Sequence, residues 1–298
     1  MTIAMPEEVR EAFPVRASSM HKYDAGTVTV VGGSSRYIHA PVITGLGARA
    51  AGAGLVQLTV PDASRIAAAA LVPEATFMKL TSTCTPPSAD VTVVGMGLGT
   101  SNNAEATVSK LLSGSSGRFV LDADALTLLA KWYGGRDRGY QCGPAQTLVI
   151  TPHAAEAARL LACDTAEILA DRAGAAKELC EMYSAVTVLK GESSVVASPD
   201  SPTQWVCPAG NPFMALGGMG DLLAGMIGAR WARLARLARR RDEDAGDERA
   251  RAVAAVRAAV WLHAAAADRL VAKTPPTEPC VANVAASAAS LRIECERG

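Results

Sequence analysis

The run Gly217-Gly-Met-Gly-Asp221 combines glycines with a carboxylate just before a segment that has the pattern of a helix. Glycines let main-chain N–H groups converge at the positive end of a helix dipole, where a phosphate can bind. The aspartate either caps the helix or accepts the proton of a hydroxyl that attacks the bound anion. The run therefore predicts an anion site beside a carboxylate. It is not a Walker P-loop, because no GxxxxGK[ST] sequence occurs in the chain.

Four other polar or glycine-rich segments directly follow apolar runs that read as strands. They are Gly95-Met-Gly-Leu-Gly99, Asp122-Ala-Asp124, Thr151-Pro-His-Ala-Ala-Glu156 and Lys190-Gly-Glu-Ser-Ser194. Each alone is also typical of a tight turn or a helix cap, and His153, Asp122 and Asp124 are candidates for either role. In an open parallel sheet, ligands bind beyond the carboxyl ends of the strands. Taken together, the four segments predict a cleft at that edge.

The elements that would position these segments are short apolar strands alternating with alanine-rich helices. The expected strands are 27–31, 54–60, 91–94, 118–121, 147–150, 186–189 and 194–197, and the expected helices include 40–52, 222–240 and 250–272. Continuous apolar strands are typical of a parallel sheet covered on both faces, which predicts a layered α/β/α fold. Gly45-Leu-Gly47 imitates a dinucleotide fingerprint but lies inside a helix pattern, and the acidic stretch 242–248 is expected to be a solvated loop.

Composition excludes several classes of protein. The chain has 298 residues, and 29 basic residues balance 29 acidic ones, which removes the electrostatic attraction to nucleic acid or an anionic membrane. Aromatic residues make up only 4%, so a stacking platform for single strands is not expected. Seven scattered cysteines without a CxxC pair, and no apolar run of about 18 residues, favour a cytoplasmic protein with reduced thiols.

In this order, the motifs resemble those of the ribokinase-like NAD(P)H-hydrate dehydratases, which repair hydrated nicotinamide coenzymes. The resemblance covers roughly residues 21–272 and implies a three-layer α/β/α ribokinase-like fold with a mostly parallel central sheet. The matching segments are Val31-Gly-Gly-Ser-Ser-Arg-Tyr37 with Ala40-Pro41, Ala51-Gly-Ala-Gly-Leu-Val56, Gly95–Gly99, Leu121-Asp-Ala-Asp-Ala-Leu126, Thr151–Glu156, Leu189-Lys-Gly191 and Gly217–Asp221.

The resemblance implies a kinase-like dehydration that uses ADP or ATP with Mg²⁺. The nucleotide would phosphorylate the ring hydroxyl of (S)-NADHX or (S)-NADPHX, and loss of phosphate would restore NADH or NADPH. Carried over, Asp221 is the base, and Gly218 and Gly220 belong to the anion hole. The implied nucleotide residues are Lys190, Gly191, Glu192, Ser193, Ser194 and Gly220, the substrate residues are Ala40, Gly97, Gly99, His153 and Asp221, and Glu156 would hold magnesium through water.

The resemblance also sets expectations about organisation. Residues 1–298 are expected to form a single dehydratase domain, with residues 1–20 as an N-terminal extension and no epimerase domain. An NAD(P)HX epimerase would then be a separate pathway partner, and the multimeric habit of the family implies a homo-oligomer such as a tetramer.

Two alternatives stay open on the residues alone. A vitamin-precursor kinase of the same fold would share Gly218-Met-Gly-Asp221 without needing the segments around His153 and Gly97. A catalytically silent nucleotide- or coenzyme-binding protein is suggested by Phe213, Leu216 and Met219, which stand where the family usually has Gly, Thr and Thr.

Overall fold

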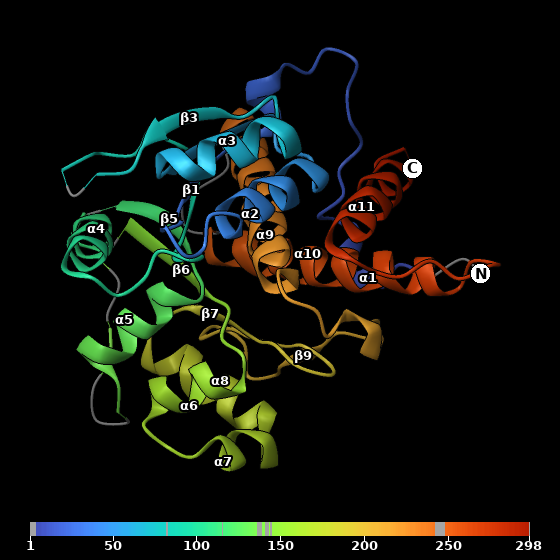
Figure 1. Ribbon diagram of the computed structural model, residues 1–298. Helices are drawn as coiled ribbons and strands as arrows, with labels where there is room; N and C mark the ends of the chain where they lie inside the picture. The colour runs from blue at the N-terminus through green and yellow to red at the C-terminus, as the bar shows by residue number, and fades with distance from the viewer. Residues whose placement is uncertain are drawn as a thin grey trace.

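The computed structural model describes residues 4–81, 83–114, 116–135, 139–140, 143, 145–241 and 248–297. Within these residues one sheet of nine strands runs through the molecule in the order β3-β2-β1-β4-β5-β6-β7-β8-β9 (Figure 1). All strand pairs from β3 to β7 are parallel, whereas β8 and β9 are added in antiparallel orientation. The strands are β1 (Thr27–Val31), β2 (Leu55–Val60), β3 (Thr76–Lys79), β4 (Val91–Val94), β5 (Ser116–Leu121), β6 (Ala145–Ile150), β7 (Val186–Leu189), β8 (Val195–Ala197) and β9 (Trp205–Val206).

Helices cover both faces of the sheet and make the outer two layers. Every residue of β1 and of β7 is buried, as expected for parallel strands covered on both sides. The helices are α1 (Glu7–Arg10), α2 (Ala40–Ala50), α3 (Asp62–Leu71), α4 (Asn102–Leu112), α5 (Asp124–Tyr133), α6 (Ala154–Leu161), α7 (Thr165–Ala170), α8 (Arg172–Met182), α9 (Met219–Arg240), α10 (Glu248–Val271) and α11 (Val281–Cys295), with short 3-10 turns η1 (Lys22–Ala25) and η2 (Pro212–Met214).

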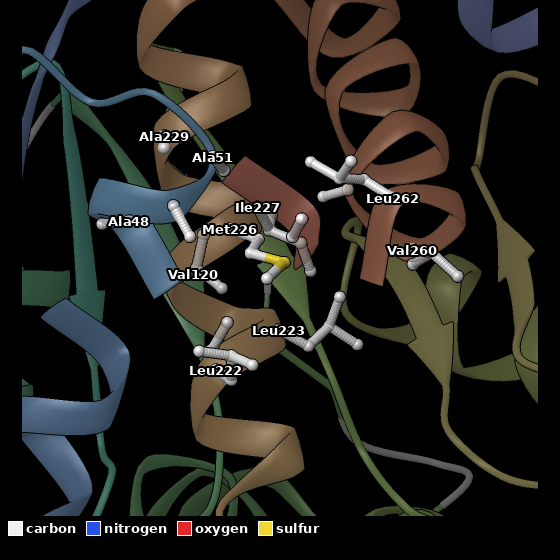
Figure 2. Close-up of a cluster of buried hydrophobic side chains, with 14 of the residues drawn as sticks. Ala48, Ala51, Val120, Leu222, Leu223, Met226, Ile227, Ala229, Val260 and Leu262 are labelled. Atoms are coloured by element: carbon white, nitrogen blue, oxygen red, sulfur yellow. The ribbon is translucent and has the colours of Figure 1, made fainter. Parts of the chain in front are cut away.

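Two apolar cores lie on opposite faces of the sheet. On one face, Val28 and Val30 of β1 belong to the core formed with α2, α9 and α10. On the other face, Val31 and Leu121 belong to the core formed with α4, α5, α6 and α8. The alternation of neighbouring valines between the two cores follows from the two-residue period of a strand. Figure 2 shows part of the first core, where Leu223 of α9 lies close to the side chains of α10.

Helix α9 carries the predicted anion site at its first turn, and its close contact with α2 holds it in place. A Cβ atom on Gly225 would overlap the main chain of Thr44 and Ala48, and one on Gly47 would overlap the main chain of Leu222. These two glycines therefore let the backbones approach each other directly, and the glycines of α2 serve packing, not dinucleotide binding. The start of α9 is thereby fixed relative to β1 and β4, against which the helix packs.

The expected strands and the three expected helices are all present, with boundaries shifted by a few residues. Strands β3 and β9 and helix α11 were not expected. Both strands are short edge strands with largely exposed side chains, so they carry little apolar signal.

The interpretation of 242–248 as a solvated loop is wrong for Glu248, which begins α10 and accepts hydrogen bonds from Arg118 (2.6 Å) and Trp231 (2.7 Å). Residues 242–247 lie outside the described residues. None of the described helices combines the length and the apolar character needed to cross a membrane.

Candidate active site

The first turn of α9 presents main-chain N–H groups toward the carboxyl edge of the sheet. Gly218 precedes the helix with φ +90°, a conformation that glycine adopts without steric cost, and no side chain caps the helix. In the described part of the chain, the amides of Gly217, Gly218 and Gly220 donate to no main-chain acceptor. Free amides at the positive end of a 22-residue helix form a site suited to an anion.

Asp221 lies in this first turn, largely shielded from solvent. Burial raises the pKa of Asp221 to about 7, and the nearby carboxylates of Asp122, Asp124 and Glu156 add to the effect, whereas the ammonium group of Lys190 opposes it. An aspartate with a pKa close to neutral is a far stronger base than an ordinary one and still loses its proton near pH 7. The carboxylate is therefore suited to accept a proton from a hydroxyl.

Beneath the helix start, Lys190 joins two acidic residues. Its Nζ lies 2.7 Å from Oδ1 of Asp122 and 3.8 Å from Oε2 of Glu156, and both carboxylates are almost fully buried. Burial by itself lowers the pKa of Lys190, but the two carboxylates outweigh it and raise the pKa above its ordinary value. A Cβ on Gly220 would lie 3.3 Å from the same Nζ, which places the ammonium group under the glycine turn.

His153 and Glu156 form a reciprocal cap at the start of α6. Glu156 Oε2 accepts from the main-chain N–H of His153 (2.8 Å), and Nδ1 of His153 accepts from the N–H of Ala155 (3.2 Å). The side chain of His153 is 52% exposed, so the imidazole remains accessible to a ligand. The two interpretations of this histidine, helix cap and ligand contact, are therefore compatible.

Asp124 connects the glycine turn after β4 to the start of α5. Its Oδ2 accepts from the N–H of Gly99 at 2.7 Å. Between the two aspartates, Ala123 has φ +50° and ψ −116°, a strained conformation for a residue with a Cβ. The strained peptide places Asp122 against Lys190 and Asp124 against Gly99, so both carboxylates belong to the cleft.

The predicted coenzyme side of the cleft brings Ala40 and Gly97 together. A Cβ on Gly97 would lie 2.5 Å from Cβ of Tyr37 and 3.1 Å from Cβ of Ala40. A Cβ on Gly99 would meet nothing within 4 Å, so this turn borders open space. Tyr37, an exposed aromatic side chain at this position, ends the segment after β1 that resembles the family motif.

The predicted nucleotide loop runs from Lys190 to Ser194, between β7 and β8. Gly191, Glu192 and Ser193 are exposed, whereas the ammonium group of Lys190 turns inward to Asp122. A direct role of Lys190 toward a nucleotide stays a prediction. Sequence reasoning missed Arg172, which contacts this loop from α8, because a single arginine at a helix start carries no signal of its own.

The carboxylates at this edge offer a metal ion few ligands. Among the described residues, no three His, Cys, Asp or Glu side chains lie close enough together to hold a metal ion. Glu156 supplies carboxylate oxygens, the ligand type that magnesium prefers, but Lys190 occupies the space on its Asp122 side. A role of Glu156 toward a magnesium ion, through water, stays a prediction.

Comparison with known proteins agrees with this geometry. The family model for NAD(P)H-hydrate dehydratases matches residues 28–286. The chain is 36% identical to an ADP-dependent (S)-NAD(P)H-hydrate dehydratase from Neisseria meningitidis, over 86% of this chain and 81% of that protein. It is also 36% identical to a bifunctional NAD(P)H-hydrate repair enzyme from Gloeobacter violaceus, over 91% of this chain and 50% of that protein.

Among solved structures, the ADP/ATP-dependent NAD(P)H-hydrate dehydratase of Bacillus subtilis, co-crystallised with ATP and Mg²⁺, superposes with a TM-score of 0.79 at 26% identity. The match covers 97% of this chain and 96% of that one. The chain spans about half the length of the bifunctional relatives it matches. With a ribokinase-like α/β fold and the family model matched over most of its length, the chain belongs to the NAD(P)H-hydrate dehydratase family.

Proposed function

We propose that this protein dehydrates (S)-NADHX or (S)-NADPHX to NADH or NADPH, with ADP or ATP as phosphoryl donor. The observation that carries the proposal is the pairing of Asp221, whose pKa burial raises to about 7, with unpartnered amides in the same helical turn. Asp221 can take the proton of a hydroxyl, and the amides can stabilise the phosphoryl group that the hydroxyl oxygen then attacks. Family membership supplies the substrate class.

The two sides of the cleft would hold the two substrates. The coenzyme hydrate would lie against Ala40, Gly97, Gly99 and His153, with its ring hydroxyl directed to Asp221. The nucleotide would lie along the loop 190–194 with its terminal phosphate at Gly218 and Gly220. This arrangement would place the hydroxyl oxygen between Asp221 and the terminal phosphorus, opposite the leaving oxygen of the nucleotide, which is the alignment that in-line transfer needs.

The reaction would then proceed in two stages. Asp221 accepts the hydroxyl proton as the oxygen bonds to the terminal phosphorus and the bond to the leaving nucleotide breaks. Phosphate then leaves the ring with its bonding electrons, and loss of a proton from the neighbouring carbon restores the ring double bond. Phosphate leaves readily where hydroxide does not. When bound with the nucleotide, magnesium neutralises phosphate charge, and Glu156 would hold it through water.

The direct test is to incubate the purified protein with hydrated NADH, ADP or ATP, and magnesium. Recovery of the absorbance of reduced nicotinamide, dependent on the nucleotide, is the expected result. Nucleotide turnover only with a vitamin precursor would instead establish a kinase, and binding without turnover would establish a silent protein. The preference between ADP and ATP, the homo-oligomeric state, the separate epimerase partner and the cytoplasmic location stay predictions.

A further inference from the structure

Arg172, the first residue of α8, reaches under the exposed loop between β7 and β8. Its guanidinium group donates to the main-chain carbonyls of Leu189 (3.1 Å) and Ser193 (2.9 Å), with a longer contact to that of Lys190 (3.5 Å). The helix start itself is fixed, since Asp171 caps it by accepting from the N–H of Gly174 at 2.8 Å. One side chain on a fixed helix therefore binds three carbonyl groups within residues 189–193.

This contact determines which way the peptide groups of the loop face. Carbonyls that point inward to Arg172 leave the N–H groups of the loop free to point elsewhere. In the described part of the chain, the amides of Gly191, Glu192 and Ser193 donate to no main-chain acceptor. An exposed run of consecutive amides without main-chain partners can donate to an anion.

The charge of Arg172 is also available to such an anion. The ion pairs among the described residues include none for Arg172, whereas the ammonium group of Lys190 pairs with Asp122 and Glu156. Within the same part of the chain, the guanidinium group makes its hydrogen bonds to the three carbonyl groups. Among the described residues, no carboxylate forms an ion pair with Arg172, so no neighbouring acid neutralises its charge.

Gly191 shows how closely the loop and the guanidinium group fit. A Cβ on Gly191 would overlap Arg172, lying 2.6 Å from both Cζ and one terminal nitrogen. Because the clashing atoms are the far end of a flexible side chain, an alanine at this position would displace the guanidinium group without straining the main chain. Two separate substitutions can therefore remove the same contact.

We infer that Arg172 is a positioning residue for the nucleotide: it orients the amides of loop 191–193 toward the phosphates of a nucleoside diphosphate or triphosphate. The inference rests on the proposed function for the location of the nucleotide. It predicts that loss of Arg172 weakens nucleotide binding, and that neither proton transfer by Asp221 nor binding of the coenzyme hydrate is affected.

The test measures the dissociation constant of ADP with magnesium for the full chain and for Arg172→Ala, Arg172→Lys and Gly191→Ala. We expect affinity to fall roughly tenfold or more in Arg172→Ala and Gly191→Ala, which is the typical effect of losing charge-assisted hydrogen bonds. Arg172→Lys should be intermediate, because an ammonium group keeps the charge without the planar fork. Lys177→Ala on the same helix is the matched control, since Lys177 pairs with Glu181 and does not contact the loop.

Kinetics and rescue separate positioning from a structural role. In Arg172→Ala, KM for the nucleotide should rise with kcat and KM for the hydrate nearly unchanged, and millimolar guanidinium ion should restore part of the affinity. Equal ADP affinity in Arg172→Ala and the parent protein would overturn the inference, as would a matching loss of kcat and of stability without rescue. If Arg172→Ala does not fold, Gly191→Ala and Arg172→Lys decide the question by the same measurements.

The outcomes also separate this inference from the proposed function. If the protein binds ADP but does not dehydrate the hydrate, the proposed function fails, and the ADP affinities of the variants still decide the role of Arg172. If the hydrate is dehydrated and Arg172→Ala binds ADP normally, only the inference fails. A parent protein that binds neither ADP nor ATP overturns both; if it binds only ATP, the same affinities are measured with ATP.

Discussion

Two of the buried ionic clusters among the described residues differ in how completely their charges are partnered. The site cluster, Asp122, Glu156, Lys190 and Asp221, lies at the carboxyl edge of the sheet. The terminal cluster, Arg230, Arg292 and Glu296, joins α9 to α11 near the C-terminus of the described chain. In the terminal cluster, Glu296 accepts from Arg230 at 2.6 Å and from Arg292 at 2.5 Å.

Most charges of the terminal cluster are partnered. Three further donations from the two arginines reach main-chain carbonyls of Ala12, Ala50 and Ala51, whereas Nε of Arg230 is buried without a partner. The Arg230 guanidinium lies 4.5 Å from the ring centroid of Phe13. Burial lowers the pKa of Arg230, and Glu296 opposes the shift. The cluster therefore connects the N-terminal segment, α2, α9 and α11 without leaving a reactive group.

The site cluster instead contains three carboxylates and one ammonium group. Lys190 contacts Asp122 and Glu156, and among the described residues no hydrogen bond is made to the carboxylate of Asp221. An acid that is buried beside other acids keeps its proton to higher pH. Among the described residues, Asp221 thus lacks a hydrogen-bond partner and can act as a base, whereas Glu296 is held by two arginines and serves the structure.

The largest effect is expected from Asp221→Asn. Turnover should fall by a factor of roughly 10²–10⁴ because the amide cannot accept a proton, while ADP binding persists because the amides of the helix start are unchanged. Steady-state kinetics and calorimetry of ADP binding measure the two effects. Activity within tenfold of the parent protein would show that Asp221 is not the base.

The same variant should gain stability at alkaline pH. The pKa of Asp221 is raised to about 7 in the folded state from an ordinary 3.8, so the penalty on folding grows from pH 4 and is complete above pH 7. A neutral asparagine avoids the penalty, and the free energy of unfolding at pH 8.5 should rise by up to about 4 kcal/mol, with little change near pH 4. Denaturant unfolding at the two pH values tests this, and equal effects at both would contradict it.

Glu296→Gln tests the terminal cluster. Without the carboxylate, the guanidinium groups of Arg230 and Arg292 remain buried with no counter-charge, which should cost about 3–5 kcal/mol of stability. Urea unfolding gives the loss, and kcat at a temperature where the variant is folded should match the parent protein. A loss below about 1 kcal/mol would show that solvent screens the cluster.

Asp122→Asn and Lys190→Met should move the pH profile in opposite directions. Because the base must be deprotonated, kcat/KM should fall as the pH drops below about 7. Asp122 raises the pKa of Asp221 and Lys190 lowers it, so the acid limb should move down in the first variant and up in the second, by about one pH unit or less. Shifts of the same sign would refute the assigned interaction of the four groups.

The smallest effect is expected from Glu294→Gln. Glu294 pairs with Arg269 at 2.9 Å, only a short distance along the chain from Glu296, but its side chain is exposed to solvent and that of Arg269 is partly exposed. Exposed pairs contribute little, so the free energy of unfolding should change by less than about 1 kcal/mol. This variant is the control for Glu296→Gln, and a comparable loss in both would remove the distinction between buried and exposed pairs.

Much of the fold could be read from particular runs of residues. The buried strands 27–31, 91–94 and 186–189 coincide with β1, β4 and β7, because a strand covered on both faces must be apolar throughout. Edge strands β3 and β9 escape this rule, since they bury only part of their surface. Helix α11 is rich in alanine and has no strong apolar face, so its sequence does not stand out.

The roles of the predicted site residues stay predictions, but the structure shows which of these residues lie together. The turns after β4, β5, β6 and β7 do meet the start of α9 at one edge of the sheet. The sequence did not predict that the ammonium group of Lys190 turns inward to Asp122. It also did not predict that Arg172 binds the carbonyl groups of the loop. Both depend on contacts between residues far apart in the sequence, 68 positions for Lys190 with Asp122 and 17 to 21 for Arg172 with its carbonyls.

The sequence by itself determined the alternation of strands and helices, the edge at which polar residues gather, and the presence of a carboxylate after a glycine turn. These features follow from local periodicity and from residue type. Only the tertiary structure decided which carboxylates share Lys190, how far Asp221 is shielded from water, and which amides remain free. Electrostatic energy depends on the distances between charges and on their burial, and local sequence specifies neither quantity.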